Sequence, residues 1–160
     1  MKRIFLTIAT AALLSVNVFA ADGGKKANDA SANVSYAAQQ QFITDFTTAK
    51  EINWTITKNC QKVDFTIDGA KKTAFYSLSG DFLGTTQVIA YNAIPAKTQK
   101  LVADNYKGYV AGEVIVYQAN EALNADIEPT TYFVDLKSNS HELLVRVTGE
   151  GNVEFFKQVK

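Results

Sequence analysis

The sequence has one cysteine, Cys60, and one histidine, His141, among 160 residues. A single cysteine excludes an intramolecular disulfide, so either the core is stable without one or Cys60 forms a bridge to another chain. We interpret Cys60 as a small, half-buried strand residue, because a free cysteine packs like a small apolar side chain. One cysteine and one histidine cannot form a tetrahedral zinc site without carboxylates. No metal and no cofactor are therefore expected.

Few residues could perform nucleophilic catalysis. His141 follows a turn made by Ser138, Asn139 and Ser140. Adjacent residues of a strand point to opposite faces, so we expect Ser140 and His141 not to share a proton. The acidic residues are spread over both halves of the chain with no spacing that makes two of them converge, and the glycines mark turns rather than a phosphate-binding loop. The sequence predicts that the protein is not an enzyme.

The chain also lacks an excess of charge of either sign. It has 16 basic and 16 acidic residues and no block of lysine or arginine, and without Lys2 and Arg3 its formal charge is −2. Binding to nucleic acid or to an anionic membrane surface depends on clustered positive charge. Neither partner is expected.

The first 20 residues have the pattern of a secretory signal peptide. Lys2 and Arg3 precede an apolar run over residues 4–18, and small residues occupy positions 18 and 20, the two positions that signal peptidase inspects before a cleavage site after Ala20. The run is short for a membrane span, so we expect no membrane insertion after cleavage. Residues 21–32 are rich in Gly, Lys, Asn, Ser and Ala without periodicity, which predicts a flexible tether. The protein is therefore expected to be periplasmic or secreted.

The first half of the remaining chain predicts one helix followed by four strands. The helix is amphipathic, and Asn33 or Ser35 could cap it. Its apolar residues lie three or four apart: Ala38, Phe42, Phe46 and Ala49. Alternating apolar and polar residues predict strands near 52–57, 63–67, 73–78 and 85–89. Asp68 and Gly69 suit a tight hairpin turn, so these strands form an antiparallel meander.

The second half repeats this order. Ile94–Pro95 opens a helix, and strands follow near 113–117, 131–136, 143–147 and 152–156. Residues 75–80 align with 144–149, and residues 63–67 align with 131–135. We interpret the chain as two diverged copies of one unit, about 33–92 and about 93–160. The predicted fold class is α+β: a tandem repeat of a helix plus a four-stranded antiparallel meander, with both helices on one face of the sheet.

Several local markers resemble a known family. They are Trp54 after a helix ending in 46–49, the strand of Phe65 ending in Asp68–Gly69, the strand of Phe75 ending in residues 79–81, then Ile94–Pro95 and the Tyr106-Lys107-Gly108-Tyr109 segment. Their order is similar to that in the PepSY-like, beta-lactamase-inhibitor-like (BLIP-like) exported proteins of Bacteroidetes. The resemblance extends from about Val34 to Phe156. It implies tandem helix-on-sheet repeats, and most members of the family have no assigned activity.

The resemblance also implies a mode of action. The wider PepSY group includes modules thought to bind or restrain peptidases, and the inhibitor that gives the BLIP-like proteins their name binds its enzyme with the open face of its sheet. We therefore expect a non-catalytic exported binding module whose partner is a protein or peptide, such as a peptidase or another envelope protein. The candidate binding residues are aromatic side chains expected on the sheet face away from the helices: Phe75 in the first half and, in the second half, Tyr117 with either Tyr132 or Phe133. Two alternatives remain: these rings cover one another by cross-strand pairing, or the protein carries a small apolar ligand between helices and sheet.

Overall fold

The structure is a computed structural model that describes residues 33–123, 128–149 and 151–159. It is an α+β fold, and the predicted signal peptide and tether lie outside the described residues. In chain order the elements are α2 (Tyr36–Asp45), β1 (Lys50–Ile56), β2 (Gln61–Ile67), β3 (Ala70–Tyr76), β4 (Phe82–Ala90), the short 3-10 helix η2 (Tyr91–Ala93), α3 (Ala96–Asn105), β5 (Val110–Ala119), β6 (Thr130–Lys137), β7 (Glu142–Thr148) and β8 (Val153–Gln158).

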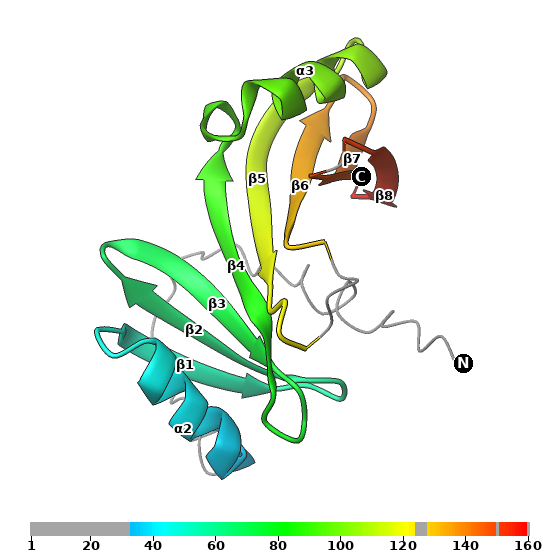
Figure 1. Ribbon diagram of the computed structural model, residues 1–160. Helices are drawn as coiled ribbons and strands as arrows, with labels where there is room; N and C mark the ends of the chain where they lie inside the picture. Colours follow the sequence, from blue (N-terminus) through cyan, green and yellow to red (C-terminus); the bar gives the residue numbers. More distant parts are fainter. Residues whose placement is uncertain (1–32, 124–127, 150, 160) are drawn as a thin grey trace, which may run out of the picture.

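All eight strands form one antiparallel sheet in the order β1 to β8, so every strand pairs only with its neighbours in the sequence. The β2–β3 hairpin turns at Asp68 and Gly69, whose φ angles of 51° and 76° are those of a tight left-handed turn. Figure 1 shows α2 beside β1–β3 and α3 beside β5 and β6, at opposite ends of the molecule. The strands β4 and β5 join the two ends.

Helix α2 is fixed at its first turn by a buried glutamine. The Ser35 side chain caps the helix by accepting a hydrogen bond from Ala38 N at 3.3 Å. Ser35 N in turn donates to Oε1 of Gln61 at 2.7 Å, and Nε2 of Gln61 donates to Ser35 Oγ at 2.9 Å and to Ser77 O at 2.8 Å. The glutamine therefore joins the start of α2 to β2 and to the β3–β4 turn.

The apolar side of α2 packs on the first half of the sheet. Its buried residues Ala38 and Phe42 belong to a cluster with Phe65 and Tyr76, as the spacing of the helix residues predicted. The rings of Phe42 and Phe65 meet edge to face at 5.1 Å, and Trp54 lies 5.6 Å from both Phe42 and Tyr76. This half therefore has an aromatic core.

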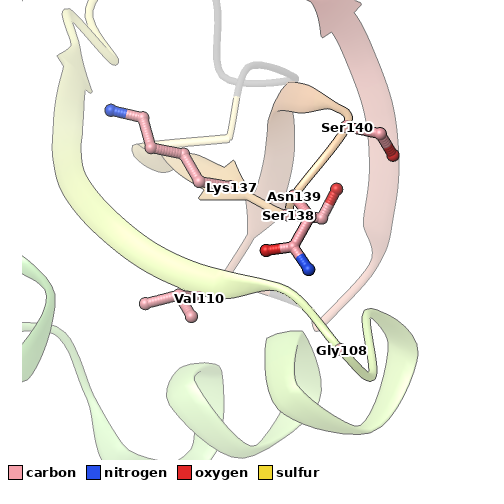
Figure 2. Close-up of a pocket in the computed structure, with 6 residues that line it drawn as sticks. All are labelled: Gly108, Val110, Lys137, Ser138, Asn139 and Ser140. Carbon is pink, nitrogen blue, oxygen red and sulfur yellow. The ribbon is translucent and has the colours of Figure 1, made fainter.

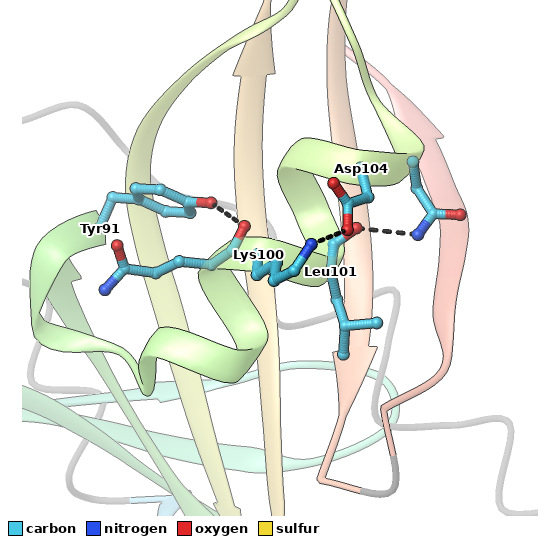
Figure 3. Close-up of polar contacts among 6 residues, drawn as sticks. Tyr91, Lys100, Leu101 and Asp104 are labelled. Carbon is cyan, nitrogen blue, oxygen red and sulfur yellow. Dashed lines mark hydrogen bonds and ion pairs between the residues drawn. The ribbon is translucent and has the colours of Figure 1, made fainter.

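Helix α3 packs on the second half through a mainly aliphatic core. The buried members of this core are Ile94, Val102, Val114, Val134, Leu136, Val145 and Val147. Figure 3 shows polar contacts made by α3. Tyr91 Oη donates to Gln99 O at 2.9 Å, and Lys100 pairs with Asp104 at 2.7 Å. The Tyr91 contact attaches η2 to α3, so the connection after β4 is held in place.

Both helices lie on the same face of the sheet. In β4, Thr85 is opposite Ala74 of the first core, and Ile89, four residues later, is opposite Val114 of the second core. Side chains an even number of residues apart in a strand share a face. The strand predicted near 73–78 ends earlier than expected: β3 ends at Tyr76, and Leu78 lies beyond it and is exposed.

Candidate functional site: the open face of the sheet

The face of the sheet opposite α2 and α3, here called the open face, carries its own set of side chains. In β3, Phe75 lies between Ala74 and Tyr76, which both belong to the first core, so Phe75 points to the open face. The same alternation and the strand register give the open-face residues of the inner strands: Lys62, Asp64, Thr66, Thr73, Phe75, Gly84, Thr86, Val88, Ile115, Tyr117, Thr131, Phe133, Asp135, Leu144, Arg146 and Thr148.

Two of the predicted binding residues lie on this face but are buried. Phe75 is 6% exposed and Phe133 is 3% exposed. The ring of Phe133 meets Phe156 of β8 edge to face at 5.0 Å, and Leu144 beside it is also buried. The expectation that Phe75 and Phe133 offer exposed rings is wrong, because alternation gives the face of a side chain but not what covers it. Both rings are therefore part of a buried layer on the open face and are not accessible to a partner.

Tyr132 lies on the other face. It packs against the aliphatic core beneath α3, together with its neighbour Val134. Phe133 takes the open face, and adjacent strand residues cannot share a face, so Tyr132 is not a residue of the open face. Of the two alternatives, Tyr132 or Phe133, the structure selects Phe133.

Tyr117 is the predicted residue that lies on the open face and keeps part of its ring accessible. The ring lies over Gly84 of β4: a Cβ built on Gly84 would come within 2.9 Å of Tyr117 Cε2, so only glycine leaves room for it. Tyr117 Oη donates a hydrogen bond to Leu83 O at 2.9 Å. Burial raises the pKa of Tyr117, so the phenol stays neutral and remains a donor. Its orientation on the sheet is therefore fixed.

The accessible apolar surface of the open face lies at the middle of the sheet. Val88 of β4 is 47% exposed and lies directly opposite Ile115 of β5, which is half-buried. Tyr117 follows two residues later on the same face of β5, opposite Thr86. We call Val88, Ile115 and Tyr117 the central patch. The sequence-based prediction missed Val88 and Ile115 because it considered only aromatic residues, although Val88 and Tyr117 both follow from strand alternation.

Charged side chains lie on both sides of the central patch, and most are paired. On β2 and β3, Thr73 Oγ1 donates to Asp64 at 2.6 Å, and Lys62 Nζ lies 3.9 Å from the same carboxylate. On β7 and β8, Arg146 lies 3.7 Å from Glu154. These charge pairs give the patch a polar border of both signs.

A third group of charges lies at one end of the open face. Lys137 Nζ contacts Asp135 at 3.0 Å and Glu142 at 3.1 Å, and the hydrogen bonds to Asp135 and then Glu142 raise the pKa of Lys137. Lys137 also lines a shallow depression of about 440 Å³ together with Gly108, Val110 and the residues of the β6–β7 turn (Figure 2). Its lining is as polar as it is apolar, so it is not the enclosed apolar cavity that a lipid or sterol carrier would use.

The β6–β7 turn contains one contact that differs from expectation. Ser140 Oγ lies 2.7 Å from His141 Nδ1, so the expectation that these two residues could not share a proton is wrong. The turn departs from strand geometry at Ser140, and this brings the hydroxyl to the ring. In the described part of the chain the imidazole makes no second hydrogen bond, and both residues are exposed. The pair therefore lacks the buried third group that orients a catalytic base.

The other candidate sites are structural. Cys60 is buried, and Sγ lies 3.4 Å from Thr57 Oγ1 in the β1–β2 turn. Among residues 33–123, 128–149 and 151–159, no three Asp, Glu, His or Cys side chains are grouped closely enough to hold a metal ion. Over the same residues, no helix combines the length and the apolar character needed to cross a membrane.

Comparison with known proteins places the fold. No family model matches the chain, and no curated protein matches its sequence. A BLIP-like protein from Bacteroides fragilis has a similar structure, with a TM-score of 0.64 and 19% identity over 78% of this chain and 86% of that one. A DUF2874 family protein from Bacteroides uniformis has a TM-score of 0.68 and 13% identity over 78% and 89% of the two chains. A proposed periplasmic protein from Bacteroides eggerthii has a TM-score of 0.64 and 15% identity over 78% and 87%. At these identities the likeness is one of fold, and it confirms the expected BLIP-like fold.

Proposed function

We propose that this protein is an exported, non-catalytic binding module that holds a protein or peptide partner against the open face of its sheet. The first 20 residues direct export and are removed, and the unit from residue 33 onward carries the site. A periplasmic location agrees with the signal-like sequence and with the proposed location of one of the similar structures. The central patch is the contact point.

The observation that supports this proposal is the exposure of Val88. It lies on the fourth strand of eight, in the middle of the sheet and opposite a second apolar residue, so the two form an accessible apolar pair away from both sheet edges. An accessible apolar area with a polar border is typical of protein-binding surfaces. The buried rings of Phe75 and Phe133 pack against the neighbouring strands and keep them in place, and Tyr117 supplies an aromatic ring in a fixed orientation.

The similar structures suggest the kind of partner. One of them is BLIP-like, which makes restraint of an enzyme, such as a peptidase of the envelope, the first activity to test. The two halves of the chain, each a helix followed by four strands, would then act as two copies of one unit that meet at β4 and β5. Phe75 and the aligned Leu144 both lie on the open face and both are buried, which supports the duplication.

The experiment is an affinity capture with matched variants. Purified protein is immobilised and exposed to envelope extract, and retained proteins are identified by mass spectrometry. Val88→Lys is expected to reduce retention of the specific partner at least about tenfold, because a charge replaces the apolar contact. Leu78→Lys is the control, since Leu78 is exposed to a similar degree but lies in the β3–β4 turn. Any retained peptidase is then assayed with and without the protein.

The proposal fails on either of two results. One is that Val88→Lys and unaltered protein retain the same set of proteins at the same level. The other is that Leu78→Lys lowers retention as strongly as Val88→Lys does, because binding would then depend on exposed apolar area in general rather than on the central patch.

A further inference from the structure

Within residues 33–123, 128–149 and 151–159, strand β1 is an edge of the sheet, and its outer side is only partly protected. It pairs with β2 and with no other strand in the order β1 to β8. An edge strand offers unpaired backbone donors and acceptors to any extended chain, and proteins usually block it with charges or a bulge. In β1 these devices lie at one end: Lys50 and Glu51 are charged, Glu51 has a φ of 54°, and the register shifts between Lys50 and Asn53. The register shift ends at Asn53, and the segment from residue 52 to residue 56 contains no charged residue and no positive φ angle.

This unprotected segment is apolar on the side of the helix. Trp54 is half-buried in the first core, and Ile52 and Ile56, two residues on either side of it, are 49% and 38% exposed. Ile43 of α2 is 59% exposed. One flank of α2 is packed on the β3–β4 turn at Ala37, so Ile43, on the opposite flank, lies toward β1. Three exposed isoleucines therefore adjoin the free backbone of the edge.

We propose that two copies of this chain associate through β1, paired antiparallel about Trp54. The apolar residues of the segment are symmetric about Trp54, so a two-fold axis there places Ile52 of each copy opposite Ile56 of the other. Asn53 and Thr55 meet in the same way on the opposite face. The register is thus self-complementary, and the eight-stranded sheets of the two copies become continuous.

The other edge does not offer this match. In β8 the exposed Phe155 stands next to the charged Glu154, and Lys157 follows two positions later, also exposed. Pairing of β8 with itself or with β1 would bring charged side chains opposite apolar ones. The unprotected half of β1, in contrast, contains no charge. A second copy is therefore the occupant that the sequence of β1 fits best.

The size and charge of the contact set its strength. About five residues of each β1 and one side chain of each α2 take part, which belongs with the small interfaces under about 1,200 Å². The association is therefore weak and reversible. The charged residues Lys50, Glu51 and Lys58 lie outside the paired segment, and Lys58 belongs to the β1–β2 turn. Apolar side chains and backbone hydrogen bonds therefore hold the two copies together, and added salt changes the dimer little.

The test is sedimentation equilibrium of the purified protein from about 1 µM to about 1 mM, at low and high salt. Ile52→Lys is expected to weaken dimerisation about tenfold or more, because an ammonium group then faces Ile56 of the second copy. The double variant Ile52→Lys/Ile56→Glu restores dimerisation, since the two-fold register places the new lysine of each copy opposite the new glutamate of the other. Ile52→Lys/Ile56→Lys does not restore it, and Phe155→Lys on β8 leaves it unchanged.

Trp54 supplies a second readout, because it is the only tryptophan in the chain and lies at the two-fold axis. Its emission is expected to shift with protein concentration in the unaltered protein and not in Ile52→Lys, while circular dichroism shows that both are folded. A protein that stays monomeric throughout the concentration range overturns the proposal. A dimer that resists Ile52→Lys, or that the Lys/Glu pair fails to restore, overturns it as well.

Discussion

The phenol of Tyr76 gives the sharpest quantitative test of the first core. Tyr76 is fully buried between Trp54 and Phe82, with ring centroids 5.6 Å and 5.5 Å away. Its hydroxyl has no hydrogen-bond partner among the described residues. A buried polar group without a partner destabilises the folded state, because water satisfies the same group when the chain unfolds. Tyr76→Phe removes the hydroxyl and keeps the ring.

The magnitude follows from the desolvation of one hydroxyl. An unsatisfied buried hydroxyl costs about 1–3 kcal/mol, and the small void left by one oxygen offsets part of this gain. We expect Tyr76→Phe to stabilise the protein by roughly 1–2 kcal/mol, which moves the urea midpoint upward by about 0.3–2 M for the usual range of m. Burial, and secondarily the charge of Asp45, raises the pKa of Tyr76. The folded state therefore holds this proton at a pH where the unfolded chain releases it, so stability falls as the pH rises above about 10. Tyr76→Phe should make this alkaline decline shallower.

Tyr117→Phe is the matched control. Both tyrosines lose the same atom, but the Tyr117 hydroxyl donates to Leu83 O, so its removal should destabilise the protein by about 0.5–1 kcal/mol. The loss stays at the lower end because Asn120 N also donates to this carbonyl, at 3.0 Å. Urea unfolding followed by circular dichroism measures both variants. If Tyr76→Phe destabilises the protein by as much as Tyr117→Phe does, the Tyr76 hydroxyl has a partner, and the reasoning fails.

Three further changes test other parts of the structure. Gln61→Ala leaves Ser35 N without its acceptor and removes the hydrogen bonds from Gln61 to Ser35 Oγ and Ser77 O, so it should destabilise the protein by about 2–4 kcal/mol in urea. An effect below about 1 kcal/mol would show that this network is not important for stability. Gly80→Ala should lower the free energy of unfolding by about 2–4 kcal/mol, because the φ of Gly80 is +105° and a Cβ would lie 2.6 Å from a side chain of α2. Gly69→Ala, at a φ of +76° with open space around it, should lower it by only about 1–2 kcal/mol. Equal effects of the two substitutions would contradict the steric argument. Hydrogen bonds from the hydroxyls of Ser77 and Ser79 hold the pKa of Asp81 below its usual value. The ionised Asp81 carboxylate therefore stabilises the folded state above about pH 4, and this stabilisation is lost as the pH falls through the lowered pKa. Asp81→Asn should therefore lower the thermal midpoint at pH 7 and have little effect near pH 2, and a constant difference at all pH values would contradict this assignment.

The strands and helices could be predicted because their signals are local. Alternation located the strands of the meander, and the spacing of Ala38 and Phe42 identified the face of α2 that packs on the sheet. Asp68 and Gly69 form the predicted turn, since few other pairs adopt two positive φ angles in succession. Ser35, one of two possible caps, is the one that the structure uses. Each of these features depends on a few consecutive residues.

The candidate site was less predictable because exposure depends on distant parts of the chain. Alternation placed Phe75 and Phe133 on the open face, but their burial depends on what covers that face, and for Phe133 this includes Phe156 on β8. Tyr132 and Phe133 could not be separated without the strand register, which fixes which of two adjacent residues points to α3. The contact of Ser140 with His141 depends on the geometry of a turn rather than of a strand. Val88 was overlooked because only aromatic residues were considered as candidates for the open face.

The order of the strands has a consequence for how the chain acquires its structure. Since each strand pairs with the one before it, a chain that emerges from its N-terminus finds the partner of each new strand already in place. Such short-range pairing lowers the contact order and favours rapid folding for an all-antiparallel sheet. The connection from Ala90 to Val110 contains η2 and α3, which must form before β5 can pair with β4. We expect the rate-limiting step of folding to be the closure of this loop, with β1–β4 forming first and serving as the template for the rest.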